Sequence, residues 1–245
     1  MNTVYIVGIG PGEYKKMTIE AVDILKKCDI IVGYTVYTQL LMPYFPQKTY
    51  IDTPMKKEEE RCRLAFQTAQ KGHDVALVCS GDAGVYGLAG LMILLEKEYP
   101  GCRTEVVAGV SSMLSGAAVL GAPLIHDFAV ISLSDLLTPW EKIEKRLLYA
   151  AEADFVICIY NPSSKKRADY LQKACDIILN KRSETTECAV VRNIGRQGEE
   201  SVCMTLKCLR EYRADMFCTV FIGSSMTKRI GERLVTPRGY NIEKF

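Results

Sequence analysis

The chain has 245 residues, 48% of them hydrophobic, which is enough for two domains that each bury a core. Its 31 basic and 29 acidic residues leave a formal net charge of +2, which excludes the global basic field that attracts nucleic acid or an anionic membrane. The segment Met1–Thr3 is unlike a signal peptide, and no apolar run reaches the roughly 18 residues of a membrane span, so we expect a soluble, cytoplasmic protein.

A strand, a glycine-containing loop and a helix recur three times in the first half of the chain. The three repeats are strand 4–9 with helix 18–27, strand 74–80 with helix 88–99, and strand 104–109 with helix 113–120. A short strand at 29–33 and a charged helix at 56–71 lie between the first two repeats. This alternation predicts a mainly parallel α/β sheet, whose ligands bind where loops leave the carboxyl ends of the strands.

Gly121 and Pro123 break the third helix, and the domain boundary is expected there. This divides the chain into an N-terminal α/β domain of residues 1–121 and a C-terminal α/β domain of residues 122–245. The second domain is expected to contain strands at 128–134, 154–160, 187–193, 200–206 and 215–223, and helices at 141–152 and 165–179. Only the loop "IGRQGE" separates the third and fourth of these strands, which indicates a hairpin and therefore a mixed sheet.

The ten cysteines are scattered along the chain and form no C-x-x-C pair. Cys203 and Cys208 lie closest together, but their spacing is not that of metal ligands. Cys158 and Cys218 lie in apolar strand runs, where a reduced thiol acts as a small hydrophobic group. With only two histidines in the chain, the sequence predicts no metal site.

The first loop, "VGIGPGE" at 7–13, carries no phosphate signature. The dinucleotide fingerprint requires glycine or alanine where Glu13 stands, and Pro11 removes a backbone N–H that could bind a phosphate. In addition, no acidic residue ends the next strand, "DIIVGY", to bind a ribose. These features disfavour an NAD- or flavin-dependent oxidoreductase and predict the close approach of another kind of ligand.

Seven motifs spread over essentially the whole chain resemble those of the tetrapyrrole methylase superfamily. In chain order they are "VGIGPG", "SGDAGVYG", "AGVSS", "HDFAVISLSDLLTPW", "YNPSSKKR", "RNIGRQGE" and "TPRGY". Within the superfamily the chain resembles the cobalamin-pathway enzymes that methylate C-17 of a precorrin or cobalt-precorrin and contract the ring. Relatives usually have proline at the position of Ala108, a difference that loosens a turn without removing a ligand group.

The resemblance implies the two-domain tetrapyrrole methylase fold, a homodimer, and S-adenosylmethionine in the interdomain cleft, with S-adenosylhomocysteine as its product. This cofactor has no phosphate, and its carboxylate, amine, ribose and adenine suit backbone amides, small residues and polar acceptors. The expected cofactor-binding residues are Pro11, Ser80, Gly81, Asp82, Val85, Ser111, Ser112, Tyr160, Asn161, Asn193 and Ile194. For Asp82 and the two serines, helix capping or turn formation is the alternative interpretation.

A tetrapyrrole substrate carries several acetate and propionate groups, so basic residues near the loops are expected to bind it. The expected substrate-binding residues are Gly8, Gly10, Gly12, Lys15, Lys16, Ser132, Ser134, Arg192 and Arg196, with Lys165, Lys166 and Arg167 as further basic candidates. For any single basic residue, a solvated surface charge is the alternative interpretation.

Methylation requires two aligned reactants and no side-chain nucleophile, whereas ring contraction also moves a proton. His126 is the first candidate for the acid–base group because it lies at the expected domain junction, while His73 is expected in a turn. Asp135 and Tyr160 are the alternatives, and a structural hydrogen bond is the other interpretation of His126.

The leading hypothesis is methylation of a cobalt-precorrin-3 or cobalt-factor III intermediate at C-17, with ring contraction and lactone formation. The metal-free precorrin-3B reaction, methylation of another precorrin, and a catalytically silent tetrapyrrole carrier remain the alternatives.

Overall fold

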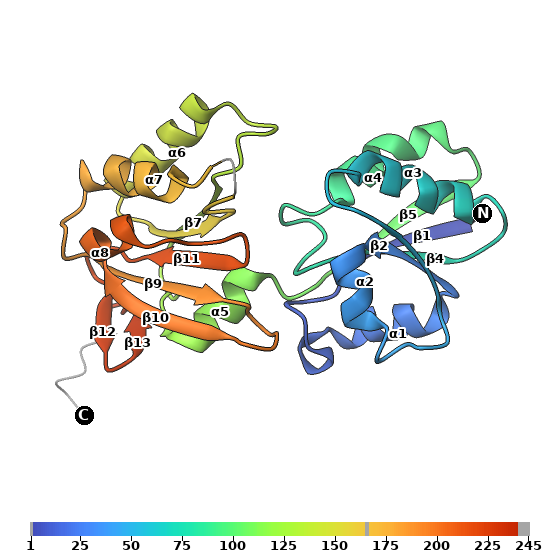
Figure 1. Ribbon diagram of the computed structural model, residues 1–245, viewed down its shortest axis with the longest axis horizontal. Helices are drawn as coiled ribbons and strands as arrows, with labels where there is room; N and C mark the ends of the chain where they lie inside the picture. Colours follow the sequence, from blue (N-terminus) through green and yellow to red (C-terminus); the bar gives the residue numbers. More distant parts are fainter. Residues whose placement is uncertain (1, 165–166, 240–245) are drawn as a thin grey trace. The chain divides into compact units, whose positions relative to one another are not determined.

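A computed structural model describes residues 2–164 and 167–239 of the chain (Figure 1). The chain divides into two compact units, Met1–Ser112 and Met113–Phe245. This division comes earlier in the chain than the expected boundary at 121–122. The reason is that helix α5 (Ser112–Leu120) packs Ala117 and Leu120 against Phe221, in a core of the second unit.

Five parallel strands form the sheet of the first unit, in the order β3-β2-β4-β1-β5. The strands are β1 (Asn2–Gly8), β2 (Ile30–Tyr34), β3 (Thr49–Thr53), β4 (Val75–Cys79) and β5 (Cys102–Val107). The expected parallel sheet is therefore confirmed. The sequence does not predict strand β3, because "TYIDT" at this edge of the sheet is only partly buried and has no apolar run.

Helices cover both faces of this sheet (Figure 1). The helices are α1 (Ile19–Lys27), α2 (Thr35–Leu41), α3 (Glu58–Ala69) and α4 (Ala89–Leu95), with short 3₁₀ turns η1 (Tyr14–Lys16) and η2 (Glu96–Glu98). Successive residues of β1 point to opposite faces, so Val7 packs with Leu25 of α1 while Ile6 packs with Phe66 of α3. Because both faces are covered, the loops at the carboxyl ends of the strands are left to bind a ligand.

The sheet of the second unit is mixed, with the order β10-β9-β11-β8-β7. The strands are β7 (Phe128–Ser132), β8 (Val156–Tyr160), β9 (Glu187–Arg192), β10 (Glu200–Thr205) and β11 (Cys218–Ile222). Strands β7 and β8 are parallel, and the other neighbouring pairs are antiparallel. The predicted hairpin is confirmed as the β9–β10 pair, and so is the mixed sheet.

Helices α6 (Trp140–Glu152), α7 (Tyr170–Leu179) and α8 (Leu206–Glu211) pack on one face of this sheet, and α5 packs on the other. A small third sheet joins β6 (Gly121–Ala122), β12 (Lys228–Ile230) and β13 (Arg233–Val235). Helix α7 begins at Tyr170, later than expected, and ahead of it the Arg167 backbone N–H donates to the Ser164 carbonyl at 2.9 Å. Lys165 and Lys166 lie outside the described residues.

All ten cysteines are free thiols, and nine of them are buried. Burial raises the pKa of Cys158 to about 12, which keeps this thiol protonated as a small hydrophobic group. Among residues 2–164 and 167–239, no three His, Cys, Asp or Glu side chains gather in a way that could hold a metal ion. Within the same residues, no helix is both long enough and apolar enough to cross a membrane.

Candidate functional site

Three loops of the first unit meet because the strands they follow, β4, β1 and β5, are neighbours in the sheet. The loop after β1 and the loop after β4 join through a two-way backbone bridge. Gly10 donates its N–H to the Gly81 carbonyl at 3.0 Å, and Gly81 donates to the Gly10 carbonyl at 2.7 Å. Both glycines have positive φ, of 68° and 69°, a conformation that residues with a side chain rarely adopt.

Gly8 and Gly109 allow the backbones of these loops to approach closely. A Cβ atom added to Gly8 would lie 2.7 Å from the Gly109 nitrogen, and one added to Gly109 would lie 2.1 Å from the Gly81 carbonyl oxygen. No side chain fits at either position without backbone movement. Gly8 therefore has a packing role besides its predicted contact with substrate. Gly109 was not among the predicted site residues, although "AGVSS" was a recognised motif.

Asp82 ties two of the loops together. One carboxylate oxygen accepts the N–H of Gly84 at 2.7 Å, and the other accepts the N–H of Gly109 at 2.9 Å. The first bond makes a local turn, and the second joins the loop after β4 to the loop after β5. Asp82 thus shapes the loops, as its alternative interpretation anticipated, while its remaining lone pairs stay available.

The other predicted residues of the first unit lie along the same edge of the sheet. Pro11, Gly12 and Ser111 are buried, Ser80, Val85 and Ser112 are half-buried, and Lys15 is exposed. Lys16 lies in η1, with its amine 3.9 Å from the Glu13 carboxylate. These loops combine small residues, hydroxyl groups and backbone amides. They can therefore bind a polar ligand that carries both a positive and a negative charge.

A second group of predicted residues gathers where the parallel strands β7 and β8 end. Ser132 pairs with Tyr160 in the register, and the Asn161 side-chain amide donates to the Ser132 hydroxyl at 2.9 Å. The Tyr160 hydroxyl accepts the backbone N–H of Met113 at 2.9 Å, close to the start of α5. Asn161 has a φ of +52°, so the chain turns sharply as it leaves β8.

Asp135, in the loop after β7, is held by two residues that follow β8. The Tyr170 hydroxyl donates to its carboxylate at 2.6 Å, and the Arg167 guanidinium contacts the other carboxylate oxygen at 3.2 Å. The hydrogen bond from Tyr170 and the charge of Arg167 hold the pKa of Asp135 below its usual value, against the opposing effect of burial. Asp135 is therefore a paired carboxylate at neutral pH, which suits a structural acceptor better than a proton donor.

Four more predicted residues lie at the end of β9, on the same edge as Tyr160, because β8 and β9 are both antiparallel to β11. They are Arg192, Asn193, Ile194 and Arg196. Arg192 contacts Asp215 at 2.9 Å, and this hydrogen bond raises the pKa of Arg192. Asn193 has a φ of +52°, like Asn161, so an asparagine turns the chain at the end of each of the two strands that flank β11.

His126 does not join this group. It precedes β7, whereas Ser132, Asp135 and Tyr160 lie at or beyond the far ends of β7 and β8. At about 3.3 Å per residue, the five residues of β7 alone place these edges more than about 13 Å apart. The His126 ring is exposed, and its Nδ1 accepts the backbone N–H of Asp127 at 2.9 Å.

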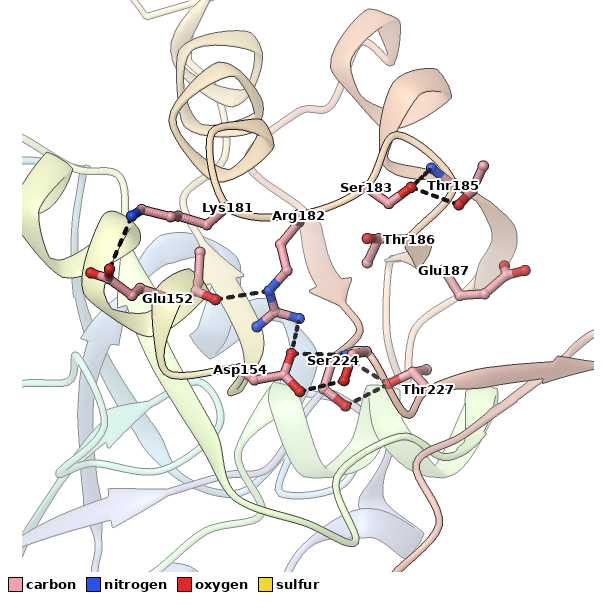
Figure 2. Close-up of a pocket in the computed structure, with 12 residues that line it drawn as sticks. Glu152, Asp154, Lys181, Arg182, Ser183, Thr185, Thr186, Glu187, Ser224 and Thr227 are labelled. Atoms are coloured by element: carbon pink, nitrogen blue, oxygen red, sulfur yellow. Dashed lines mark hydrogen bonds and ion pairs between the residues drawn. The ribbon is translucent and has the colours of Figure 1, made fainter.

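A cavity of about 480 Å³ opens at this opposite edge of the second sheet (Figure 2). None of the predicted site residues lines it. Its charged side chains largely neutralise one another, since Lys181 contacts Glu152 and Arg182 contacts Asp154, each at 2.9 Å. A smaller cavity of about 140 Å³, lined by His126 and Asp127, shares Asp154 with it. The loops at the carboxyl edges are thus the better candidate site, although they line neither cavity.

Comparisons with known proteins bear on what these loops do. A family model described as Tetrapyrrole (Corrin/Porphyrin) Methylases matches residues 3–209. The chain is 44% identical over 238 residues to the "Probable cobalt-factor III C(17)-methyltransferase" of Salmonella typhimurium, covering 97% of this chain and 99% of that protein. It is 38% identical over 249 residues to the "Precorrin-3B C(17)-methyltransferase" of a Sinorhizobium species, covering 98% and 97% of the two chains.

The fold is also similar to that of solved structures. For the crystal structure of the methyltransferase CobJ, the TM-score is 0.89 at 32% identity, covering 97% of this chain and 100% of that chain. For the uroporphyrin-III C-methyl transferase of Thermus thermophilus complexed with S-adenyl homocysteine, the TM-score is 0.74 at 22% identity, covering 90% and 97% of the two chains.

Proposed function

The chain belongs to the tetrapyrrole (corrin/porphyrin) methylase family, and from this premise we propose that it is an S-adenosylmethionine-dependent C-methyltransferase of cobalamin biosynthesis. Its proposed reaction is methylation of a cobalt-factor III or cobalt-precorrin-3 intermediate at C-17, with ring contraction and lactone formation. The observation that carries this proposal is the 44% identity, over nearly all of both chains, to a relative named for that substrate.

The metal-free precorrin-3B reaction is the second candidate, because a relative named for it is 38% identical over nearly the whole chain. The identity to the cobalt-factor III relative is higher, which favours the cobalt-containing substrate. In either case the metal would be part of the substrate and would not be bound by protein ligands.

The residues at the loops of the first unit fit S-adenosylmethionine by their chemistry. Gly10 and Gly81 have no side chain to cover the backbone where the two loops join. A Cβ atom added to Gly81 would lie 3.6 Å from the Ser111 Cα, an ordinary contact distance, so the loops leave some space at this glycine. Ser80, Ser111 and Ser112 add hydroxyl groups that both donate and accept hydrogen bonds. When bound, this cofactor supplies an electrophilic methyl group on its sulfonium.

The chain's own residues would bind and orient the two reactants. We assign cofactor binding to Pro11, Ser80, Gly81, Asp82, Val85, Ser111 and Ser112 in the first unit, and to Tyr160, Asn161, Asn193 and Ile194 in the second. Holding a ring carbon and a methyl donor in line can lower the activation barrier by roughly 7–11 kcal/mol, so no nucleophilic side chain is needed. Buried Pro11 and Ile194 would help to exclude water from the reacting groups.

The acidic side chains of the tetrapyrrole would be bound by polar and basic residues near the strand ends. The proposed substrate-binding residues are Gly8, Gly10, Gly12, Lys15, Lys16, Ser132, Ser134, Arg192 and Arg196. Of the three residues considered for the proton transfer that ring contraction requires, His126, Asp135 and Tyr160, we propose Tyr160, because Asp135 is a paired carboxylate and His126 lies at the opposite edge of the sheet. A homodimer and a cytoplasmic location are also part of this proposal. Light scattering at micromolar concentration tests whether the chain forms a homodimer.

The proposed function is tested by turnover of the purified chain with methyl-labelled S-adenosylmethionine. Cobalt-factor III and precorrin-3B are supplied in parallel, and the products are analysed by mass spectrometry. We expect the gain of one methyl group with cobalt-factor III, at a kcat/KM at least about tenfold above that with precorrin-3B. Labelling of neither substrate would contradict the proposal, and binding without labelling would favour a tetrapyrrole carrier.

A further inference from the structure

Two loops that leave the parallel pair β7 and β8 are joined through one carboxylate. Asp135 lies in the loop after β7, and Arg167 and Tyr170 follow β8, about 32 to 35 positions later in the chain. The Arg167 Nη1 reaches both Asp135 and the Ser134 hydroxyl, the latter at 2.9 Å, while its Nε donates to the Ser164 hydroxyl at 3.1 Å. One guanidinium thus contacts three side chains on two loops.

This cluster differs from an ordinary surface ion pair. The Arg167 side chain is only 18% exposed, and Asp135 is 32% exposed. The Tyr170 ring also packs on Trp140, with ring centroids 4.6 Å apart, at the point where α6 begins. The segment from Leu133 to Trp140 is therefore held at both ends, by Asp135 and by the Trp140 contact.

Between these two anchors the chain exposes two large apolar side chains. Leu136 is 66% exposed and Leu137 is 98% exposed. Two adjacent exposed leucines on a loop that is held at two points form a small apolar surface in a defined position, which suits contact with another apolar surface. A tetrapyrrole ring has a broad apolar face surrounded by acidic side chains, and the predicted substrate residues Ser132 and Ser134 lie just before these leucines.

We propose that Asp135, Arg167 and Tyr170 form a positioning lock that holds Leu136 and Leu137 against the face of the tetrapyrrole, next to Ser132 and Ser134. This inference rests on the proposed function. It assigns Asp135 to positioning and not to proton transfer, in agreement with the depressed pKa of its carboxyl group. It also adds Leu136 and Leu137 to the substrate-binding residues, and Tyr170 to the positioning residues.

The lock is tested with Tyr170→Phe and Asp135→Asn, steady-state kinetics on the tetrapyrrole, and calorimetry with S-adenosylhomocysteine. We expect the KM for the tetrapyrrole to rise about tenfold in each variant, because each loses a hydrogen bond to or from a charged group. We expect kcat and the cofactor affinity to stay within about twofold, since the removed interaction serves binding and not the chemical step. Leu137→Ser should raise the same KM about fivefold.

Matched controls separate the lock from general effects on folding. Tyr149→Phe removes an exposed hydroxyl from α6, and Asp176→Asn breaks an exposed ion pair with Arg210 on the same unit. Both controls should leave KM unchanged. Tyr170→Phe keeps the ring that packs on Trp140, so its melting temperature should stay within about 4 °C of the wild type.

Each further outcome has a defined meaning. Wild-type KM in Tyr170→Phe and Asp135→Asn would overturn the lock while leaving the proposed function intact. A loss of kcat of about 10²-fold at constant KM in Asp135→Asn would make Asp135 catalytic and also overturn it. If Leu137→Ser changes the oligomeric mass but not KM, the leucines contact a second copy of the chain and the proposal is wrong. A wild-type protein without turnover of either tetrapyrrole would overturn the proposed function itself, and with it the lock.

Discussion

Tyr160 and His126 differ in what surrounds their titratable atoms. The Tyr160 hydroxyl accepts the Met113 N–H, and Tyr160 pairs with Ser132 in the strand register and directly precedes Asn161. The Nδ1 of His126 accepts a backbone N–H, and the ring lines a small cavity with Asp154 at the other edge of the sheet. Of the two, only Tyr160 lies among the other residues proposed to bind the reactants.

We therefore expect Tyr160→Phe to slow ring contraction by about 10²-fold, the usual scale for an acid–base group. His126→Ala is expected to stay within about threefold of the wild type, which reverses the order that the sequence favoured. The measurement is single-turnover product analysis by mass spectrometry, with a thermal melt to check that Tyr160→Phe remains folded. A His126→Ala protein that methylates without contracting the ring would restore the histidine as the acid–base group.

The sequence could identify many residues of the candidate site but not their contacts. Ser132, Tyr160 and Asn161 were recognised from motifs, and the structure brings them together. His126 is favoured by sequence because it is one of only two histidines and lies at the expected domain junction, and neither property indicates which edge of a sheet a residue occupies. The role of Gly109 depends on the close approach of loops far apart in the sequence, and no local pattern reveals it.

At the scale of elements, Arg182 joins the ends of one helix and two strands in the second unit. Its Nε donates to the Ala151 carbonyl at 2.9 Å, its Nη1 to the Gly223 carbonyl at 2.8 Å, and its Nη2 to the Phe155 carbonyl at 2.9 Å. The guanidinium also contacts Asp154 at 2.9 Å (Figure 2), and the side chain is only 5% exposed. The end of α6, the start of β8 and the end of β11 are thus held by one side chain.

Arg182→Met is expected to destabilise the second unit by about 3–5 kcal/mol, because it removes a buried charged donor from three backbone carbonyls and from the Asp154 carboxylate. The neighbouring Lys181→Met is the control, since its exposed pair with Glu152 should contribute only about 0–1 kcal/mol. Urea unfolding followed by circular dichroism measures both. Equal, small losses in the two variants would show that Arg182 is not a structural anchor.

Acid should weaken the same anchor. Burial raises the pKa of Asp154, but the hydrogen bonds from Ser225 and the charge of Arg182 outweigh it, so the pKa lies below its usual value. A carboxyl group whose pKa is lower in the folded state contributes stability above its unfolded pKa of about 3.9, and that stability is lost as the pH falls through the folded value. Protonation of Asp154 at low pH is therefore expected to weaken its ion pair with Arg182 and to lower the stability of the second unit.

The elements that the sequence predicted are those with long apolar runs, such as β4 and β8, or a helical repeat closed by a cap, such as α1. Thr18, the first residue of the expected helix 18–27, is the N-cap of α1, with its side-chain oxygen accepting the Ala21 N–H at 3.1 Å. The missed elements lack such signals. Strand β12 has only three residues, all exposed, and the seven-residue helix α2 follows β2 without a break. Contacts with neighbouring elements stabilise β12 and α2, and no local sequence pattern predicts them.

At the scale of the whole molecule, each unit has two cores, one on each face of its sheet. Each unit also presents its predicted ligand-binding loops at the carboxyl ends of parallel strands, after β1, β4 and β5 in the first and after β7 and β8 in the second. The proposed cofactor residues are shared between the two units, so a bound cofactor should affect both.

S-adenosylhomocysteine is therefore expected to stabilise both units. At 100 times its Kd it should add about 2.7 kcal/mol to the free energy of unfolding, whereas NAD at the same concentration should add nothing, because the loop after β1 lacks the dinucleotide fingerprint. Hydrogen exchange with mass spectrometry should then show slower exchange in residues 80–85 of the first unit and in residues 160–161 and 193–194 of the second. Protection confined to the first unit would remove Tyr160, Asn161, Asn193 and Ile194 from the cofactor site, and stabilisation by NAD would contradict the proposed cofactor. Exchange in residues 126–127 serves as the internal control, since His126 lies at the edge of the sheet opposite the proposed ligand-binding loops and should exchange at the same rate with and without the cofactor product.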